Sequence, residues 1–224
     1  MDIMGRGAYS LAEAAKLTNL RPGRVREWFR PAREGSSEVA VFSGDYPAIG
    51  GDKAISFLDL LEVYIVGNLR EADPPVSLQK IRKVHQKAAA KVGHKHPFCV
   101  GEIYHKHGGI FTRTTDDEGV GQGPVIDVLS NQAYFNAVIM PFFKKIEYDH
   151  LTDLAKLWRI AEGVVVDPTI NFGKPTVEEV GIATRVLAGA FEANGRDADR
   201  VADWYGIKPR HVRSAAAFEL RQAA

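Results

Sequence analysis

The sequence has very little cysteine and no long apolar run. Its 224 residues include a single cysteine, Cys99, so no disulfide can form within the chain, as is usual in a reducing cytoplasm. The longest apolar-rich stretch, 57–69, is interrupted by polar side chains and is shorter than the roughly 20 residues that cross a bilayer. The first six residues lack the apolar core of a secretion signal. These absences predict a cytoplasmic protein that has no membrane partner.

The sequence also lacks the short motifs of several enzyme classes. It contains no glycine-rich phosphate loop of the G-x-x-x-x-G-K-[ST] type and no serine nucleophile of the G-x-S-x-G type. The candidate zinc ligands are His94, His96, Cys99, His105 and His107. Their spacing matches no established ligand pattern, and basic side chains at a helix end explain the first two equally well. We therefore expect no catalytic residue, no cofactor and no resident metal.

Charge is nearly balanced over the chain but is distributed unevenly. The whole sequence has 29 basic and 28 acidic residues, with 45% apolar residues, as in an ordinary globular protein of one or two domains. Residues 1–96 carry 15 basic and 11 acidic side chains, and the segment 80–95 has six bases and no acid. A basic amino-terminal half favours a polyanionic partner, although solvated helix faces account for the charge alone.

Two short helices are predicted near the amino terminus. Ser10 and Glu13 have the spacing of a capping box, so a helix is expected over 11–17. After a three-residue turn, Pro22 stands where a second helix begins, and that helix is expected to end near Phe29. Two short helices joined in this way form a helix-turn-helix, whose second helix enters the major groove of DNA. The residues expected to contact DNA are Ser10, Arg21, Arg24, Arg26 and Arg30.

The rest of the chain predicts a mainly α fold with small β elements, an α+β class. The glycine-rich segment 31–55 surrounds an apolar run, Val39–Phe42, which predicts the strand of a wing. Helices are expected over 57–71 and 77–92, and short strands over 98–100, 102–104, 109–112, 125–128 and 164–166. Further helices are expected over 184–193, 197–205 and 209–221. Three domains follow: a winged helix-turn-helix over 1–96, a central mixed β/α region over 97–161, and a trihelical domain over 162–224.

The carboxy-terminal helices repeat the local pattern of the first helix-turn-helix. Residues 20–26 line up with residues 207–213, sharing an apolar turn residue, a base, a helix-opening proline, a valine and an arginine in the same order. The repeat indicates a second helix-turn-helix. Proline at the first helical position is common, and trihelical units also serve as protein-binding modules, so a second DNA reader is one alternative of two.

Several segments resemble known regulators. Tyr9–Ala15 followed by Val25–Trp28 resembles the helix-turn-helix of MerR-like regulators. Residues 56–62, 76–82 and 96–98 are similar to the continuation seen in VapB-type antitoxins with such a domain. Residues 163–175, 201–206 and 212–219 are similar to the small carboxy-terminal domain of that family. The resemblance implies an antitoxin that silences a PIN-like ribonuclease toxin and represses its own operon.

The leading hypothesis from the sequence is therefore a non-enzymatic antitoxin and autorepressor. Its expected partners are operator DNA, a PIN-like ribonuclease toxin and a second copy of the chain in a homodimer. Toxin binding is expected within 162–224, with the region 97–161 as the alternative. A second hypothesis is a ligand-responsive MerR-like transcription regulator without a toxin, in which the central region holds a sensor pocket. A third is an enzyme that uses the histidine–cysteine group.

Overall fold

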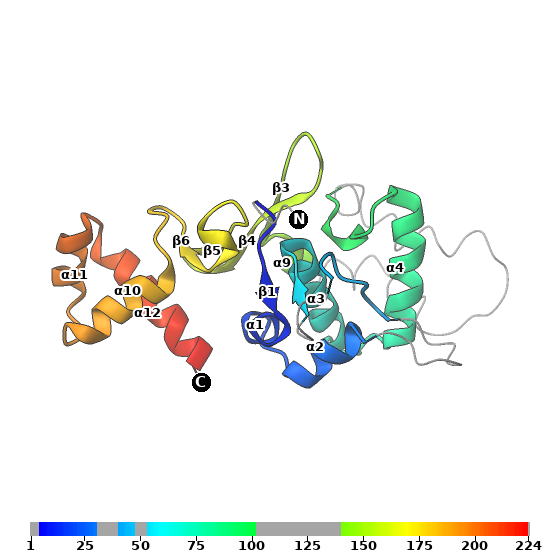
Figure 1. Ribbon diagram of the computed structural model, residues 1–224, viewed down its shortest axis with the longest axis horizontal. Helices are drawn as coiled ribbons and strands as arrows, with labels where there is room; N and C mark the ends of the chain where they lie inside the picture. Colours follow the sequence, from blue (N-terminus) through cyan, green and yellow to red (C-terminus); the bar gives the residue numbers. More distant parts are fainter. Residues whose placement is uncertain (1–4, 31–39, 48–52, 102–139, 224) are drawn as a thin grey trace. The chain divides into compact units, whose positions relative to one another are not determined.

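The computed structural model describes residues 5–30, 40–47, 53–101 and 140–223 (Figure 1). It confirms the predicted class, because helices predominate and the strands form small antiparallel sheets. The chain divides into two compact units, one made of residues 9–155 and the other of residues 1–8 and 156–224. We call them the N-terminal unit and the C-terminal unit. Within the described part of the chain, no helix combines the length and the apolar character needed to cross a membrane.

The N-terminal unit begins with the predicted pair of short helices. Strand β1 (Tyr9–Ser10) leads into α1 (Leu11–Leu17), and α2 (Pro22–Trp28) follows after the turn. Strand β1 pairs antiparallel with β2 (Ala54–Ile55), with Tyr9 opposite Ile55 and Ser10 opposite Ala54. The start of the helix-turn-helix is thereby tied to the segment that precedes the next helix.

The predicted wing strand at Val39–Phe42 is wrong for the part that the structure describes. Residues 40–42 are not a strand. The amides of Val41 and Phe42 both donate to the carbonyl of Trp28, at 3.0 and 3.1 Å. Because these donors are used at the end of α2, and because the Phe42 ring packs on Trp28, the segment follows the helix instead of pairing with a strand.

Helix α3 (Phe57–Glu71) forms the core of the N-terminal unit, and eleven of its fifteen residues are buried. It begins with a complete capping box: the Ser56 hydroxyl accepts from the Asp59 amide, and the Asp59 carboxylate accepts from the Ser56 amide. Helix α4 (Leu78–Val92) is amphipathic and ends at Gly93, whose φ of 65° lies in the left-handed region that glycine tolerates. Both helices were predicted with nearly these bounds.

The chain after α4 departs from the sequence prediction. The expected strand at 98–100 is instead a 3₁₀ turn, η1 (Pro97–Cys99), followed by a single bridge from Val100 to Leu154. Proline fixes the backbone at the start of this turn, and all of the residues 96–100 are buried, without the alternation of a half-buried strand. Helix α9 (Met140–Phe143) and strand β3 (Ile146–Tyr148) complete the unit. The strands expected over 102–128 lie outside the described residues.

The C-terminal unit joins a small sheet to three helices. Strands β4 (Ala155–Ala161), β5 (Val164–Val166) and β6 (Thr176–Val177) are antiparallel neighbours in that order. A 3₁₀ turn, η3 (Asn171–Gly173), lies between β5 and β6. The predicted strand over 164–166 is confirmed.

The three helices of the C-terminal unit are α10 (Thr184–Ala193), α11 (Ala198–Tyr205) and α12 (Pro209–Ala223), coloured orange to red in Figure 1. They confirm the predicted trihelical arrangement. Their apolar core has Val201, Ala202 and Val212 in one cluster and Leu187 and Ala215 in another.

Candidate functional site

The turn between α1 and α2 has the geometry of a helix-turn-helix. The Ser10 hydroxyl accepts from the Glu13 amide at 3.1 Å and begins α1 as predicted. Asn19 adopts the left-handed conformation, with φ of 56°, and the Leu20 amide donates to the Ala15 carbonyl at 2.8 Å. Pro22 then opens α2. The turn is therefore fixed by the backbone itself.

Helix α3 supports this turn through a close contact. A Cβ atom added to Gly67 would lie 2.8 Å from the Leu20 Cδ1 atom, which is shorter than side-chain contacts allow. Glycine at this position lets the Leu20 side chain rest directly on the α3 backbone. Val25 and Trp28 of α2 are buried, so the inner face of the helix-turn-helix is fully packed. The remaining face of α2, with Gly23, Arg26 and Glu27, is exposed.

The outer face of α2 is basic. Arg21, Arg26 and Arg30 are exposed there, with Glu27 as the acid on the same helix. Arg24 is placed differently, because its Nη1 atom lies 3.3 Å from a carboxylate oxygen of Glu71 at the end of α3. The structure thus leaves Arg21, Arg26 and Arg30 exposed on and beside α2 and holds Arg24 in an ion pair. Contact of these arginines and Ser10 with DNA stays a prediction.

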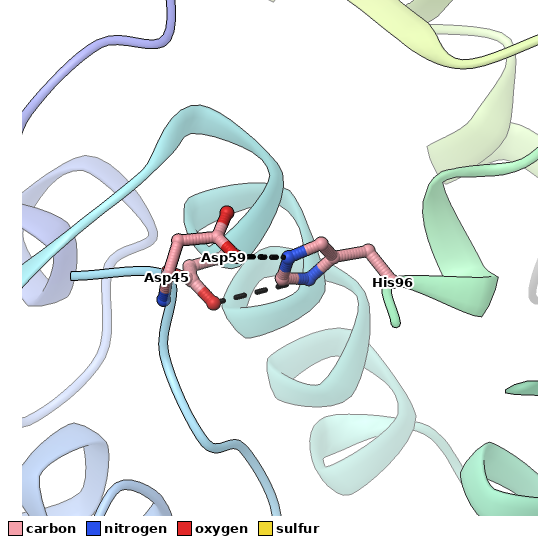
Figure 2. A group of neighbouring side chains, drawn as sticks. All are labelled: Asp45, Asp59 and His96. Carbon is pink, nitrogen blue, oxygen red and sulfur yellow. Dashed lines mark hydrogen bonds and ion pairs between the residues drawn. The ribbon is translucent and has the colours of Figure 1, made fainter. Parts of the chain in front are cut away.

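A buried ionic cluster links three segments of the N-terminal unit. Asp45 comes from the segment 40–47, Asp59 and Glu62 come from α3, and His96 follows α4. The His96 ring lies between the acids: its Nε2 atom is 3.0 Å from Asp45 Oδ1, and its Nδ1 atom is 3.4 Å from Glu62 Oε2 and 3.8 Å from Asp59 Oδ1. Figure 2 shows Asp45 and Asp59 directed at the ring.

A histidine, a lysine and a hydroxyl also contact this cluster. The Nε2 atom of His85 lies 3.0 Å from both carboxylate oxygens of Glu62. Lys95 Nζ donates to Asp45 Oδ1 at 3.0 Å, and the Ser56 hydroxyl donates to Asp45 Oδ2 at 2.6 Å. A cavity of about 190 Å³ opens beside the cluster, and its lining includes Asp59, Glu62, Arg82, His85, Lys95 and His96.

The cluster shifts the pKa values of its members in opposite directions. Burial lowers the pKa of His96, but hydrogen bonds and charge from Glu62, and then from Asp45 and Asp59, outweigh burial and raise this pKa to about 9. Burial raises the pKa of Glu62, but His85 and His96 outweigh it and bring the net shift below the usual value. The pKa of Asp45 is also lowered, because Ser56, His96 and Lys95 outweigh burial.

Asp59 is the exception among the acids. Burial raises its pKa, and the charge of His96 and the amides of Ser56 and Asp45 offset that rise only in part. Its Oδ2 atom accepts from both amides, whereas its Oδ1 atom is buried and has no hydrogen-bond partner. Asp59 is therefore the least satisfied charged group of the cluster.

Of the predicted zinc ligands that the structure describes, His96 is the one that belongs to this cluster. The buried thiol of Cys99 donates to the Leu58 carbonyl at 3.4 Å, and burial raises the pKa of this thiol well above its usual value. His94 accepts from the His96 amide through Nδ1 at 3.0 Å. His105 and His107 lie outside the described residues. The acids Asp45, Asp59 and Glu62 were not predicted from the sequence. The feature that could have indicated them is the presence of Asp59 and Glu62 in an otherwise apolar helix.

The C-terminal unit contains a second helix-turn-helix at the predicted place. Gly206, with φ of 63°, ends α11, and Pro209 begins α12. The basic side chains at the start of α12 are paired within the unit: Arg210 Nη2 donates to Glu179 Oε1 at 2.8 Å, and Arg213 Nη2 lies 3.4 Å from Asp199. This second helix thus differs electrostatically from α2.

Exposed apolar side chains gather in the C-terminal unit. Among the described residues, the large apolar side chains with high exposure are Leu151 in the N-terminal unit and Ile170, Phe172, Val186, Trp204, Tyr205 and Leu220 in the C-terminal unit. Phe172 is 67% exposed although its φ of 56° is strained for a residue with a side chain. The preceding Asn171 holds the turn by donating through Nδ2 to Thr176 Oγ1 and to the Gly181 carbonyl.

Comparisons with known proteins bear on the fold and on the C-terminal unit. A family model described as a protein of unknown function, DUF433, matches residues 164–218, from β5 to most of α12. The crystal structure of Rv2018 from Mycobacterium tuberculosis has a similar fold, with a TM-score of 0.74 and 21% identity over 92% of this chain and 96% of that chain. No curated protein matches the chain. The DUF433 match covers the segment in which the sequence analysis expected a separate family domain.

Proposed function

We propose that the chain is a non-enzymatic antitoxin that represses its own operon. In this proposal the N-terminal unit binds operator DNA as a homodimer, and the C-terminal unit binds a PIN-like ribonuclease toxin. The proposed DNA binding is supported by one observation: α2 presents exposed basic side chains on a well-packed helix-turn-helix. The toxin-binding half rests on the resemblance to VapB-type antitoxins and on the exposed apolar side chains of the C-terminal unit.

The α2 surface has the chemistry of a DNA reader. Exposed guanidinium groups neutralise phosphates and release counterions, and they also pair with guanine edges in the major groove. Arg21 stands at the beginning of α2, where base contacts are expected, and Arg30 lies beyond its end, where phosphate contacts are expected. A single short helix covers few base pairs, so specific binding needs two copies on two half-sites.

The DNA-binding half is tested by the salt dependence of binding to the region upstream of the chain's own gene. We compare the wild type with a triple variant, Arg21→Ala, Arg26→Ala and Arg30→Ala. Each lost phosphate contact lowers the slope of log K against log salt by about 0.9. Because two copies bind, the loss of about two phosphate contacts from each copy should lower the slope by about four units.

A charge-matched control is Lys144→Ala, Arg185→Ala and Arg221→Ala, which removes three exposed charges elsewhere. This control should keep the wild-type slope. A triple α2 variant with the wild-type slope and affinity would show that α2 is not the reader.

The C-terminal unit has features of a protein-binding surface. Aromatic side chains commonly anchor protein interfaces, and Phe172 and Trp204 are 67% and 59% exposed. The Arg200 guanidinium lies over the Trp204 ring, 5.2 Å from its centre. A PIN-like nuclease holds its metal with clustered carboxylates, so a basic group beside an aromatic anchor complements such a site.

The toxin-binding half is tested with the full chain co-expressed with the ribonuclease-like product of the neighbouring gene. We expect Phe172→Asp and Trp204→Asp each to abolish co-purification and to restore the growth arrest. Leu151→Asp is the matched control, because Leu151 is 97% exposed and lies in the N-terminal unit. If both C-terminal variants still neutralise the toxin, the C-terminal unit does not hold it.

A further inference from the structure

We propose that Asp45, Asp59 and His96 form a binding site for one divalent transition-metal cation, and that zinc fits this set of donors best. One donor atom from each residue lies within 4.8 Å of the other two (Figure 2). The three residues come from three different segments of the N-terminal unit. This inference is independent of the proposed antitoxin role, since it concerns binding of the ion alone.

The buried carboxylate of Asp59 is the first argument. Asp59 is 1% exposed, and its Oδ2 atom is used by the amides of Asp45 and Ser56. Its Oδ1 atom is directed at the His96 ring but lies 3.8 Å from Nδ1, which is too long for a hydrogen bond. An unsatisfied charged oxygen in the interior costs free energy, and a cation bound at Oδ1 removes that cost.

The distribution of charge is the second argument. Three carboxylates, those of Asp45, Asp59 and Glu62, lie around the His96 ring. Lys95 contacts Asp45, and His85 contacts both oxygens of Glu62. His96 is thus left as the cation nearest to Asp59 Oδ1, at ion-pair distance only. A divalent ion that binds His96 displaces a proton from the ring to solvent, so two positive charges replace one at the position where the network is weakest.

The donor set indicates the class of ion. Two carboxylates and one imidazole suit zinc and its first-row neighbours, whereas magnesium and calcium prefer oxygen donors alone. Zinc lies about 2.1 Å from such ligands, which places tetrahedral ligands roughly 3.4 Å apart. The three donors therefore need to approach one another by at most about 1.5 Å. The adjoining cavity, lined by Asp59 and His96, leaves room for a water molecule as the fourth ligand.

The surroundings already hold the ligands in place. The Ser56 hydroxyl and Lys95 both donate to Asp45, and the Ser56 amide donates to Asp59. Hydrogen bonds of this kind orient carboxylate ligands in metal sites. An ion bound here joins the segment after α2 to α3 and to the end of α4. Binding should therefore raise the melting temperature of the chain, because only the folded state brings these donors together.

The test uses the full chain, freed of metal with a chelator and then dialysed against zinc, magnesium or calcium. We expect one zinc per chain by elemental analysis, a higher melting temperature with zinc, and no binding of magnesium or calcium at the same concentration. Asp59→Asn and His96→Gln should each weaken zinc binding by about 100-fold. His150→Gln, which removes an exposed histidine, should bind as the wild type does.

Two further measurements test the proposal if the variants at the buried residues Asp59 and His96 fail to fold. In the wild type, cobalt bound in place of zinc should give an absorption spectrum of nitrogen and oxygen donors without a thiolate band. The double variant His105→Gln and His107→Gln should keep the site. Four results would each overturn the proposal. Two concern the wild type: no stoichiometric zinc, or a thiolate band with cobalt. The other two are loss of zinc in this double variant and full zinc binding by folded Asp59→Asn.

Discussion

The chain carries two helix-turn-helix units with similar local sequence, and they differ in what their second helices expose. Arg26 of α2 and its flanking residues Arg21 and Arg30 are exposed and form no ion pair with an acid in the described part of the chain, whereas the exposed bases at the start of α12, Arg210 and Arg213, pair with Glu179 and Asp199. The same backbone arrangement thus presents a basic surface in one unit and a neutralised, partly apolar surface in the other. Fold alone does not distinguish a DNA reader from a protein-binding module, but side-chain chemistry does.

The two units also differ in how they are stabilised. The N-terminal unit holds a cluster of three acids around the buried His96, whereas the described helices of the C-terminal unit pack mainly through apolar clusters, and their buried His211 contacts a single acid, Glu179. Apolar packing responds little to pH, while a buried ionic network depends on the protonation of each member. The comparison between the units can therefore be tested by stability as well as by binding.

The largest effect is expected from pH, in metal-free protein with a chelator present. The pKa of His96 is raised from 6.5 to about 9 on folding, so its charge stabilises the N-terminal unit fully below pH 6.5. That stabilisation is lost as the pH rises through 9. Asp45 and Glu62, whose pKa values are lowered, stay ionised throughout this window. The free energy of unfolding should fall by up to about 3 kcal/mol.

Native-state hydrogen exchange, corrected for intrinsic rates, measures this change at the amides of α3. The amides of α12 in the same molecule serve as the reference. His96→Gln should remove the pH dependence at α3 and leave α12 unchanged. A wild-type α3 whose opening free energy does not change between pH 6.5 and 9 would contradict this account of the cluster.

An intermediate effect is expected from matched substitutions in the two helix-turn-helix cores. Val25 and Val212 occupy corresponding positions, and both are 0% exposed. Replacing either valine with alanine removes two buried methyl groups and should cost about 2 kcal/mol within its own unit. Val25→Ala should lower protection of α1 to α3 and weaken DNA binding, while Val212→Ala should lower protection of α10 to α12. A more than tenfold loss of DNA affinity in Val212→Ala would show that the C-terminal helix-turn-helix also contributes to DNA binding.

The smallest effect is expected from removing the acid that pairs with an arginine in each unit. Glu71→Gln frees Arg24 and removes a negative charge beside the DNA-binding face, so affinity for the upstream DNA should rise about threefold at low salt. Glu179→Gln frees Arg210 in the same way, but the change in affinity should stay below about twofold. Fluorescence anisotropy with labelled DNA resolves both changes. An equal rise in the two variants would show that α12 also approaches DNA.

The sequence predicted the helical framework well because its signals are local. Helix α3 has the predicted bounds, since Ser56 caps it and its apolar run is unbroken by proline. The second helix-turn-helix was found from the repeated proline and valine positions. In contrast, no strand forms at 40–42, where the amides of Val41 and Phe42 donate to the distant Trp28 carbonyl, or at 98–100, where Pro97 opens a 3₁₀ turn. Apolar runs of three or four residues do not reveal such partners.

The ionic cluster could not be predicted for the same reason. Asp45 and His96 are 51 positions apart, and neither belongs to a known ligand spacing. Asp59 also has the position of an ordinary capping-box residue, which hides its second role. The sequence did indicate His96 as a candidate ligand, but it did not indicate Asp45, Asp59 or Glu62 as its neighbours. Only the packing of α3 against the chain that follows α4 brings the acids and the imidazole together.

The central claim is that α2, and not α12, reads DNA. The most direct measurement is the affinity of two triple variants for the upstream DNA at one salt concentration. One variant carries Arg21→Ala, Arg26→Ala and Arg30→Ala, and the other carries alanine in place of three bases around the start of α12: Lys208, Arg210 and Arg213. We predict a loss of about 100-fold for the first variant and less than about threefold for the second. Equal losses, or a larger loss in the second variant, would contradict the account.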